Sequence, residues 1–97
     1  MNKFLGILST TFLFIPLASF ARPIKSVEDY LFAFGEGTGG TLCELFDYGY
    51  ITEKTARGVR DNFLGELRYN QYKYRIARDG FNEGLTLSPK CRRLRTN

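Results

Sequence analysis

Nucleophilic catalysis is the first chemistry to consider, because the chain contains serines and two cysteines. A serine or cysteine nucleophile needs an activating base beside it, and histidine most often serves as that base. The 97 residues include no histidine. Beyond the leader described below, the only serines are Ser26, at a helix-capping position, and Ser88, which precedes a proline. We therefore expect no Ser/His/Asp or Cys/His catalytic set, and we assign no catalytic residue.

Metal and carboxylate chemistry have equally few candidates. Two cysteines without histidine cannot supply the four ligands of a structural zinc site in one chain. Glu36, Glu44 and Asp47 lie close in sequence, but paired-carboxylate hydrolysis also needs a cleft that holds a sugar. A chain of this length seldom forms such a cleft. The prediction is a protein that is not an enzyme and that uses no metal or cofactor.

A glycine-rich run, residues 35–40 (GEGTGG), matches the pattern G-x-G-x-x-G. A dinucleotide site requires a strand before this pattern and a helix that opens after it. Here a capped helix start at Ser26 precedes the run, and Thr41 follows it where a P-loop has a lysine. The run therefore indicates close packing of a continuous helix against another backbone, or a hinge between two half-helices. Helical spacing of apolar residues continues across the run and favours the continuous helix.

The first 21 residues have the pattern of a cleaved secretory signal. Met1 to Lys3 is short and positively charged, residues 4–17 carry no charge and are mostly apolar, and Ser19 and Ala21 are small residues at a signal-peptidase site. A retained membrane anchor is the alternative, but Pro16 interrupts the stretch, which is shorter than the roughly 20 residues that span a bilayer. We expect residues 22–97 to be secreted or periplasmic, without a transmembrane segment.

Export would place the two cysteines in an oxidising compartment. Cys43 and Cys91 are the only cysteines and lie 48 positions apart. A mature chain this short buries little surface and benefits from a staple. We predict one disulfide between them, which stabilises the fold by about 4 kcal/mol in the chain-entropy model. Two reduced buried thiols, or bonds to a partner chain, are the alternatives.

Two segments carry residue types that favour binding. Residues 68–75 interleave tyrosines with cations, a mixture found at protein interfaces, on nucleic-acid-binding surfaces and on ordinary amphipathic helices. Residues 90–97 are rich in basic residues and would contact anionic lipid or polysaccharide weakly, or would simply be solvated. Because the basic charge is concentrated there, the net charge of +4 gives little support to a nucleic-acid partner. The candidate binding residues are Tyr69, Tyr72, Tyr74, Lys90, Arg92, Arg93 and Arg95.

Apolar residues at helical spacing predict helices, and no strand-like alternation persists. The first helix is expected from 27 to 48, with Ser26 and Asp29 as a capping box and Gly49 just past its end. The second is expected from 53 to 68, behind Thr52 as its N-cap.

A third helix would begin after Asn70 and end near Gly84, unless it continues the second with only a kink. We therefore predict an all-α, three-helix domain over residues 22–97, stapled by the Cys43–Cys91 disulfide, with residues 90–97 as a basic C-terminal tail.

The leading functional hypothesis is an exported, non-enzymatic helical protein that binds another protein in the periplasm or cell envelope. Inhibitor, immunity and chaperone-like roles all fit. The hypothesis depends on the export signal, the stapled core, the missing catalytic set and the surplus of tyrosines. The alternative is a cationic effector that contacts anionic lipid or polysaccharide through its C-terminal tail.

Overall fold

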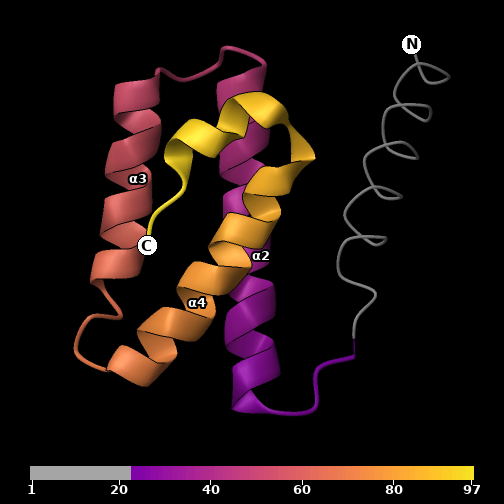
Figure 1. Ribbon diagram of the computed structural model, residues 1–97, viewed down its shortest axis with the longest axis vertical. Coiled ribbons are helices and arrows are strands. Elements are labelled where there is room, and N and C mark those ends of the chain that lie inside the picture. Colours follow the sequence, from indigo (N-terminus) through magenta and orange to yellow (C-terminus); the bar gives the residue numbers. More distant parts are fainter. Residues whose placement is uncertain (1–22) are drawn as a thin grey trace, which may run out of the picture.

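Residues 23–97 are described by a computed structural model and are all-helical (Figure 1). Three α-helices, α2 (Val27–Asp47), α3 (Glu53–Gly65) and α4 (Gln71–Gly84), precede two short 3-10 helices, η1 (Leu85–Leu87) and η2 (Pro89–Leu94). No strand occurs within this part of the chain. The prediction of an all-α fold is confirmed for these residues. The predicted leader and its cleavage after Ala21 lie outside them.

The helices begin where their capping residues predict. Ser26, Thr52 and Asn70 each accept, through a side-chain oxygen, a 3.1 Å hydrogen bond from the backbone N–H three residues further on. The cap at Asn70 makes α3 and α4 separate helices. The helix predicted to run to residue 68 ends at Gly65, because the N–H groups of Leu67 and Arg68 bond to carbonyls only three residues back and tighten the chain into a turn.

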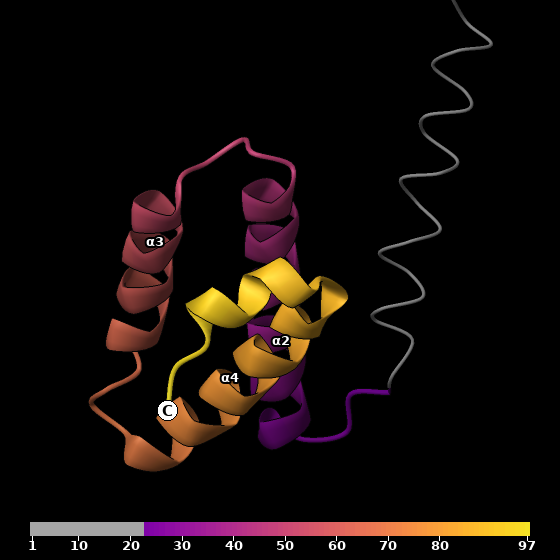
Figure 2. The same cartoon turned by 45° about the horizontal axis from the view of Figure 1, so that its top comes forward.

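The helices do not form a parallel bundle. α3 runs antiparallel beside α2, whereas α4 crosses α2 diagonally (Figure 1). After α4 the chain doubles back over the C-terminal part of α2 and turns toward α3 (Figure 2). Residues 85–97 therefore lie between the C-terminal part of α2 and the helix α3.

Glycines let α2 and α4 cross with their backbones in contact. A Cβ atom on Gly35 would collide with the carbonyl oxygen of Ala77, and one on Gly39 with that of Phe81. The reciprocal positions on α4, each facing carbonyl oxygens of α2, are Gly80 and Gly84. Such an approach also favours weak Cα–H···O contacts between helices. The glycine-rich run is thus a continuous helix packed closely on another, as its unbroken apolar spacing predicted, and not a hinge.

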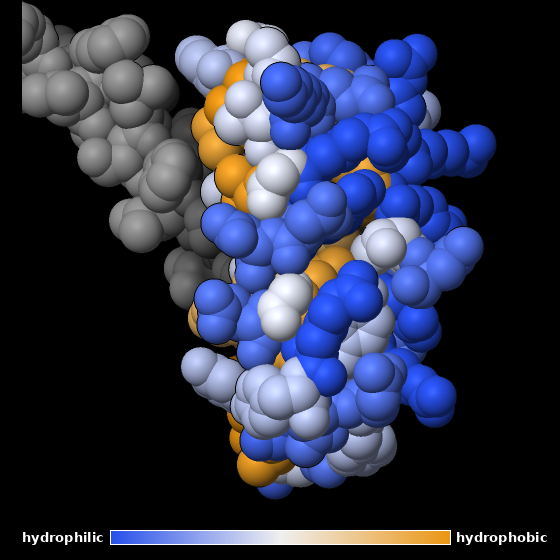
Figure 3. Space-filling view, turned by 90° about the vertical axis from the view of Figure 1, so that its left-hand side faces the viewer, coloured by the Kyte–Doolittle hydropathy of each residue, from blue (hydrophilic) through white to orange (hydrophobic). Residues whose placement is uncertain are grey.

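The third helix, α3, touches the rest of the molecule in two buried clusters. Ala56 joins the main core, which includes Phe46 and Leu94. Leu64 joins a smaller cluster with Tyr74 and Ala77. Seen from the α3 side, the surface is mostly hydrophilic, with hydrophobic atoms emerging in bands between the polar side chains (Figure 3).

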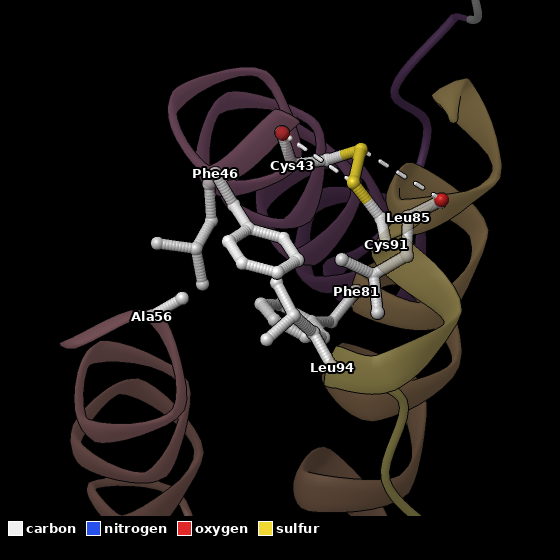
Figure 4. Close-up of a cluster of buried hydrophobic side chains, with 8 residues drawn as sticks. Cys43, Phe46, Ala56, Phe81, Leu85, Cys91 and Leu94 are labelled. Atoms are coloured by element: carbon white, nitrogen blue, oxygen red, sulfur yellow. Dashed lines mark hydrogen bonds between the residues drawn. A yellow bond between two sulfur atoms is a disulfide. The ribbon is translucent and has the colours of Figure 1, made fainter. Parts of the chain in front are cut away.

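The disulfide between Cys43 and Cys91 sits in the main core (Figure 4). Both cysteines are fully buried, and their Cα atoms are 5.5 Å apart. The disulfide fastens η2 to the C-terminal part of α2, just after the glycine-rich run. The predicted pairing is confirmed, and it buries Leu94 together with Cys91.

Candidate functional site

An apolar groove runs along the outward face of α2 beside α3. Its volume is about 460 Å³. α3 is buried against the rest of the molecule at Ala56 and at Leu64, and Val59, between these two positions, lines the groove. The lining residues are Ala33, Phe34, Gly37, Thr38, Thr41, Leu42, Leu45 and Val59.

A second hollow of about 350 Å³ continues the groove toward the start of α2. Phe34 borders both hollows, and Tyr30 and Phe63 line only the second. The ring of Phe34 stacks on Phe63 at 5.6 Å between centroids, and Phe63 stacks on the buried Phe81 at 6.2 Å. One face of Phe34 is therefore fixed by the interior, while its remaining surface is open.

Large apolar side chains remain uncovered along this groove. Phe34 is 52% exposed, Leu45 38% and Val59 43%. None of the residues that line the main groove carries a titratable group. The groove is therefore suited to bind an apolar surface.

The three tyrosines predicted as binding residues lie in different environments. Tyr74 is only 9% exposed and packs in the smaller cluster, with the Arg68 guanidinium 5.3 Å from its ring centre. Tyr72 is exposed and donates a 3.2 Å hydrogen bond to Glu28, which raises the pKa of Tyr72. Tyr69 is exposed on the turn between α3 and α4. Tyr74 is thus mainly a core residue, and binding through the other two stays a prediction.

The predicted basic tail is part of the folded domain. The ammonium of Lys90 lies 4.6 Å above the ring centre of Phe46 and donates a 3.3 Å hydrogen bond to the carbonyl oxygen of that residue, near the end of α2. Arg93 approaches Glu53 at 3.5 Å. The segment is therefore neither frayed nor free of the protein surface. Arg92 and Arg95 are its exposed cations whose side chains form neither a hydrogen bond nor an ion pair within residues 23–97.

Hydrogen bonds anchor the chain end as well. Asn82 donates a 2.7 Å bond to the Thr96 carbonyl and accepts a 3.2 Å bond from the Thr96 N–H. The Arg60 guanidinium donates to the Leu94 carbonyl at 3.1 Å, which ties α3 to η2. These contacts explain why the segment after Cys91 follows one path.

Electrostatic effects are confined to the surface. The Arg57 guanidinium, with a smaller contribution from Arg93, lowers the pKa of Glu53. The Arg60 guanidinium likewise lowers the pKa of Asp61. Among the described residues, no group of three or more His, Cys, Asp or Glu side chains is placed to hold a metal ion.

Sequence reasoning did not identify the groove. Phe34, Leu45 and Val59 follow helical apolar spacing, so we expected them on the inner face of their helices. Spacing gives the face of a helix but not the distance to its neighbour, and only the placement of α3 leaves these side chains uncovered.

Two further findings concern the whole chain. No helix within residues 23–97 is long and apolar enough to cross a membrane. Comparison of the sequence and structure with protein-family models, curated proteins and solved structures gave no match.

Proposed function

We propose that this chain is an exported, non-enzymatic helical protein that acts by binding another protein in the periplasm or cell envelope. The binding surface is the groove between α2 and α3. Inhibitor, immunity and chaperone-like roles each require such a surface and no catalytic group.

The observation that carries the proposal is the uncovered apolar lining of the groove. Phe34, Leu45 and Val59 converge on one hollow, and no described segment of the chain fills it. Single exposed apolar residues are common on proteins, but a contiguous set marks an interaction surface. Aromatic residues at the centre of a pocket contribute strongly to protein binding, and Phe34 has that position.

Export is supported by two independent features. The leader pattern precedes the domain, and the buried Cys43–Cys91 disulfide is typical of oxidising compartments. A mass measurement of the secreted protein tests both at once. We expect loss of residues 1–21 and two hydrogens fewer than in the reduced form.

Affinity capture from envelope extracts under oxidising conditions tests the binding role. The bait is the oxidised protein, and the test variant Leu45→Asp places a carboxylate in the groove. The matched control is Leu87→Asp, which adds the same charge at a residue that is exposed but outside the groove. A partner retained by the natural chain and by the control, but lost with Leu45→Asp, supports the proposal. Equal retention by both variants would refute the groove as the binding surface.

Binding through the exposed tyrosines is tested by a further variant in the same experiment. Tyr69 is 75% exposed and lies away from the groove lining. Loss of the partner with Tyr69→Ser, while Leu45→Asp retains it, would move the binding surface to the turn between α3 and α4.

The alternative hypothesis, a cationic effector that contacts anionic lipid or polysaccharide, now depends on two basic side chains. Lys90 and Arg93 have partners within the protein, so Arg92 and Arg95 would carry adhesion to anionic lipid. Truncation of residues 92–97 is a poor test, because it removes the buried Leu94. The double variant Arg92→Gln/Arg95→Gln keeps the fold, and binding to anionic vesicles at low salt should fall if this alternative holds.

A further inference from the structure

The groove has carboxylates at its border and no lysine or arginine in the lining of either hollow. Glu66, just beyond the end of α3, lines the second hollow. Glu44 lies three residues after Thr41 and seven after Gly37, which both line the main groove, so it belongs to the same face of α2. Both carboxylates are exposed, and neither forms an ion pair within residues 23–97. The groove thus presents an apolar lining with unpaired negative charge beside it.

We propose that the groove binds a cationic amphipathic α-helix of another protein. This inference rests on the proposed function, because it names the chemistry of the partner that occupies the same groove. Amphipathic helices dock in apolar grooves through apolar residues spaced at i, i+3 or i+4 and i+7. Lysine or arginine on the flanks of such a helix would face the two carboxylates. Opposite charges across an interface speed association and discriminate against wrong partners.

The lining favours a helix over an extended segment. The main groove is lined by apolar side chains, one glycine and two threonines. The hydroxyl of Thr38 already donates a 2.9 Å hydrogen bond to the carbonyl oxygen of Phe34. An extended peptide on this lining would leave backbone N–H and C=O groups without partners, which is costly for each group. An α-helix satisfies those groups internally and presents only side chains to the groove.

The dimensions of the groove determine the length of the helix that fits. The two hollows share Phe34 and together extend along α2 from Tyr30 to Leu45, which is about 22 Å at about 1.5 Å per residue. A partner helix of about four turns covers that length. Because α3 runs antiparallel to α2 (Figure 1), Glu44 and Glu66 lie near opposite ends and on opposite sides of the groove. The partner therefore needs a cation near each end, one on each flank.

A lipid fits the same features less well. A pocket for a small apolar ligand encloses most of the surface of that ligand. Here Phe34, Leu45 and Val59 remain partly exposed to solvent, so an acyl chain laid on them would keep much of its own surface in water. An anionic headgroup near Glu44 or Glu66 would also be repelled by the carboxylate.

Fluorescence anisotropy with designed peptides tests the inference. The probe is a labelled amphipathic helix of leucine and lysine, about 18 residues or five turns long, and a matched peptide has glutamate in place of every lysine. The oxidised protein secreted from an expression host should bind the lysine probe with a Kd on the order of 10–100 µM, and the glutamate peptide at least about 10-fold more weakly. Equal affinities, or no binding of the lysine probe up to about 500 µM, would overturn the inference.

Charge variants of the protein locate the contact. Glu44→Gln/Glu66→Gln removes both carboxylates and should weaken binding of the lysine probe by roughly 5-fold. The control Asp79→Asn/Glu83→Gln removes the same charge from exposed positions of α4 outside both hollows, and should change the affinity by less than about 2-fold. An equal loss in both double variants would mean that the probe responds to net charge alone, which contradicts the assignment to the groove.

Two further ligands test the class of occupant. In one pair of peptides, a central leucine of the lysine probe is replaced by proline or by alanine, and only proline breaks the helix. The proline peptide should bind at least about 10-fold more weakly than the alanine peptide, because the groove takes the helical form. Equal affinity of the pair would show that the peptide binds in an extended form. Tighter binding of palmitate than of the lysine probe would make a lipid the occupant, and either result rejects the helix.

The remaining outcomes separate this inference from the proposed function. If the lysine probe fails to bind, but the natural chain captures an envelope protein and loses it with Leu45→Asp, the partner has a different chemistry. The inference is then wrong and the proposed function stands. If the natural chain binds the lysine probe and loses it with Leu45→Asp, but captures no envelope protein, the groove binds cationic helices and the proposed function fails.

Discussion

The two sides of α2 pack in opposite ways. Toward α4, glycines on both helices bring the backbones into contact, so that no Cβ atom fits between them at Gly35 or Gly39. Toward α3, the same helix presents Phe34 and Leu45, yet these large side chains leave a groove of about 460 Å³. Small residues thus make the closed interface and large residues border the open one.

This contrast distinguishes the side of α2 that stabilises the fold from the side that can bind a partner. Where the backbones of two helices are in contact, no side chain between them can rearrange. The two helices therefore cross in a single geometry. The α3 side is held by Ala56 near its start and by Phe63 and Leu64 near its end. A helix attached at two points leaves an apolar lining between them, and that lining is available to a partner.

The strongest test of the contrast compares two phenylalanines. Phe81 is fully buried between the helices, whereas Phe34 is half-exposed in the groove. Phe81→Ala should reduce the free energy of unfolding by about 4 kcal/mol, because it leaves a cavity in the core. Phe34→Ala should reduce it by about 1 kcal/mol, because much of the ring is already in water. Urea denaturation of both variants measures the difference, and equal losses would show that the groove is as tightly packed as the core.

The glycines provide the next test. Gly39→Ala should destabilise the fold by about 3 kcal/mol, since the added Cβ meets a carbonyl of α4 and separates the helices. This cost exceeds the gain of about 1 kcal/mol in helix propensity.

The control for that variant is Gly58→Ala on α3. Apart from its chain neighbours and the backbone of its own helix, no atom lies within 4 Å of the position that its Cβ would take, so propensity alone acts and stability should rise by up to about 1 kcal/mol. A stabilising effect at both positions would contradict the close crossing of α2 and α4.

These positions also indicate how far the sequence predicts the fold. Caps are local, so Ser26, Thr52 and Asn70 locate the helix starts from neighbouring residues alone. The glycine-rich run signals close packing, because uninterrupted apolar spacing argues against a hinge. The partner of that run was not predictable, since Gly80 and Gly84 show their role only when α4 crosses α2.

The candidate site was less predictable than the helices. Exposure of Phe34 depends on the distance between α2 and α3, which a set of distant contacts determines. The basic tail shows the same limit. Its charge density predicts a solvated end, but burial of Cys91 and Leu94 draws the charged residues between them onto the protein surface.

Substitution of Lys90 tests how the C-terminal segment is held against the end of α2. Its ammonium caps the Phe46 carbonyl and lies over the Phe46 ring, so Lys90→Ala should reduce the free energy of unfolding by about 1 kcal/mol. Arg92→Ala, in the same 3-10 helix but without an ion pair within residues 23–97, should change it by less than about 0.5 kcal/mol. Thermal unfolding of the pair measures the difference, and a larger loss for Arg92→Ala would contradict these roles.

The smallest expected effect concerns the exposed ion pair between Glu53 and Arg57 at the start of α3. Arg57, and to a lesser extent Arg93, lower the pKa of Glu53 below its ordinary value of 4.5 in the folded protein. A carboxyl with a depressed folded-state pKa stabilises the fold above its unfolded-state pKa and loses that contribution as the pH falls through the folded-state value. Urea midpoints should therefore decline between pH 5 and pH 3 by slightly more in the natural chain than in Glu53→Gln. Because Glu53 and Arg57 are exposed, added salt should shrink the difference, and parallel pH profiles would show that the ion pairs of Glu53 do not stabilise the fold.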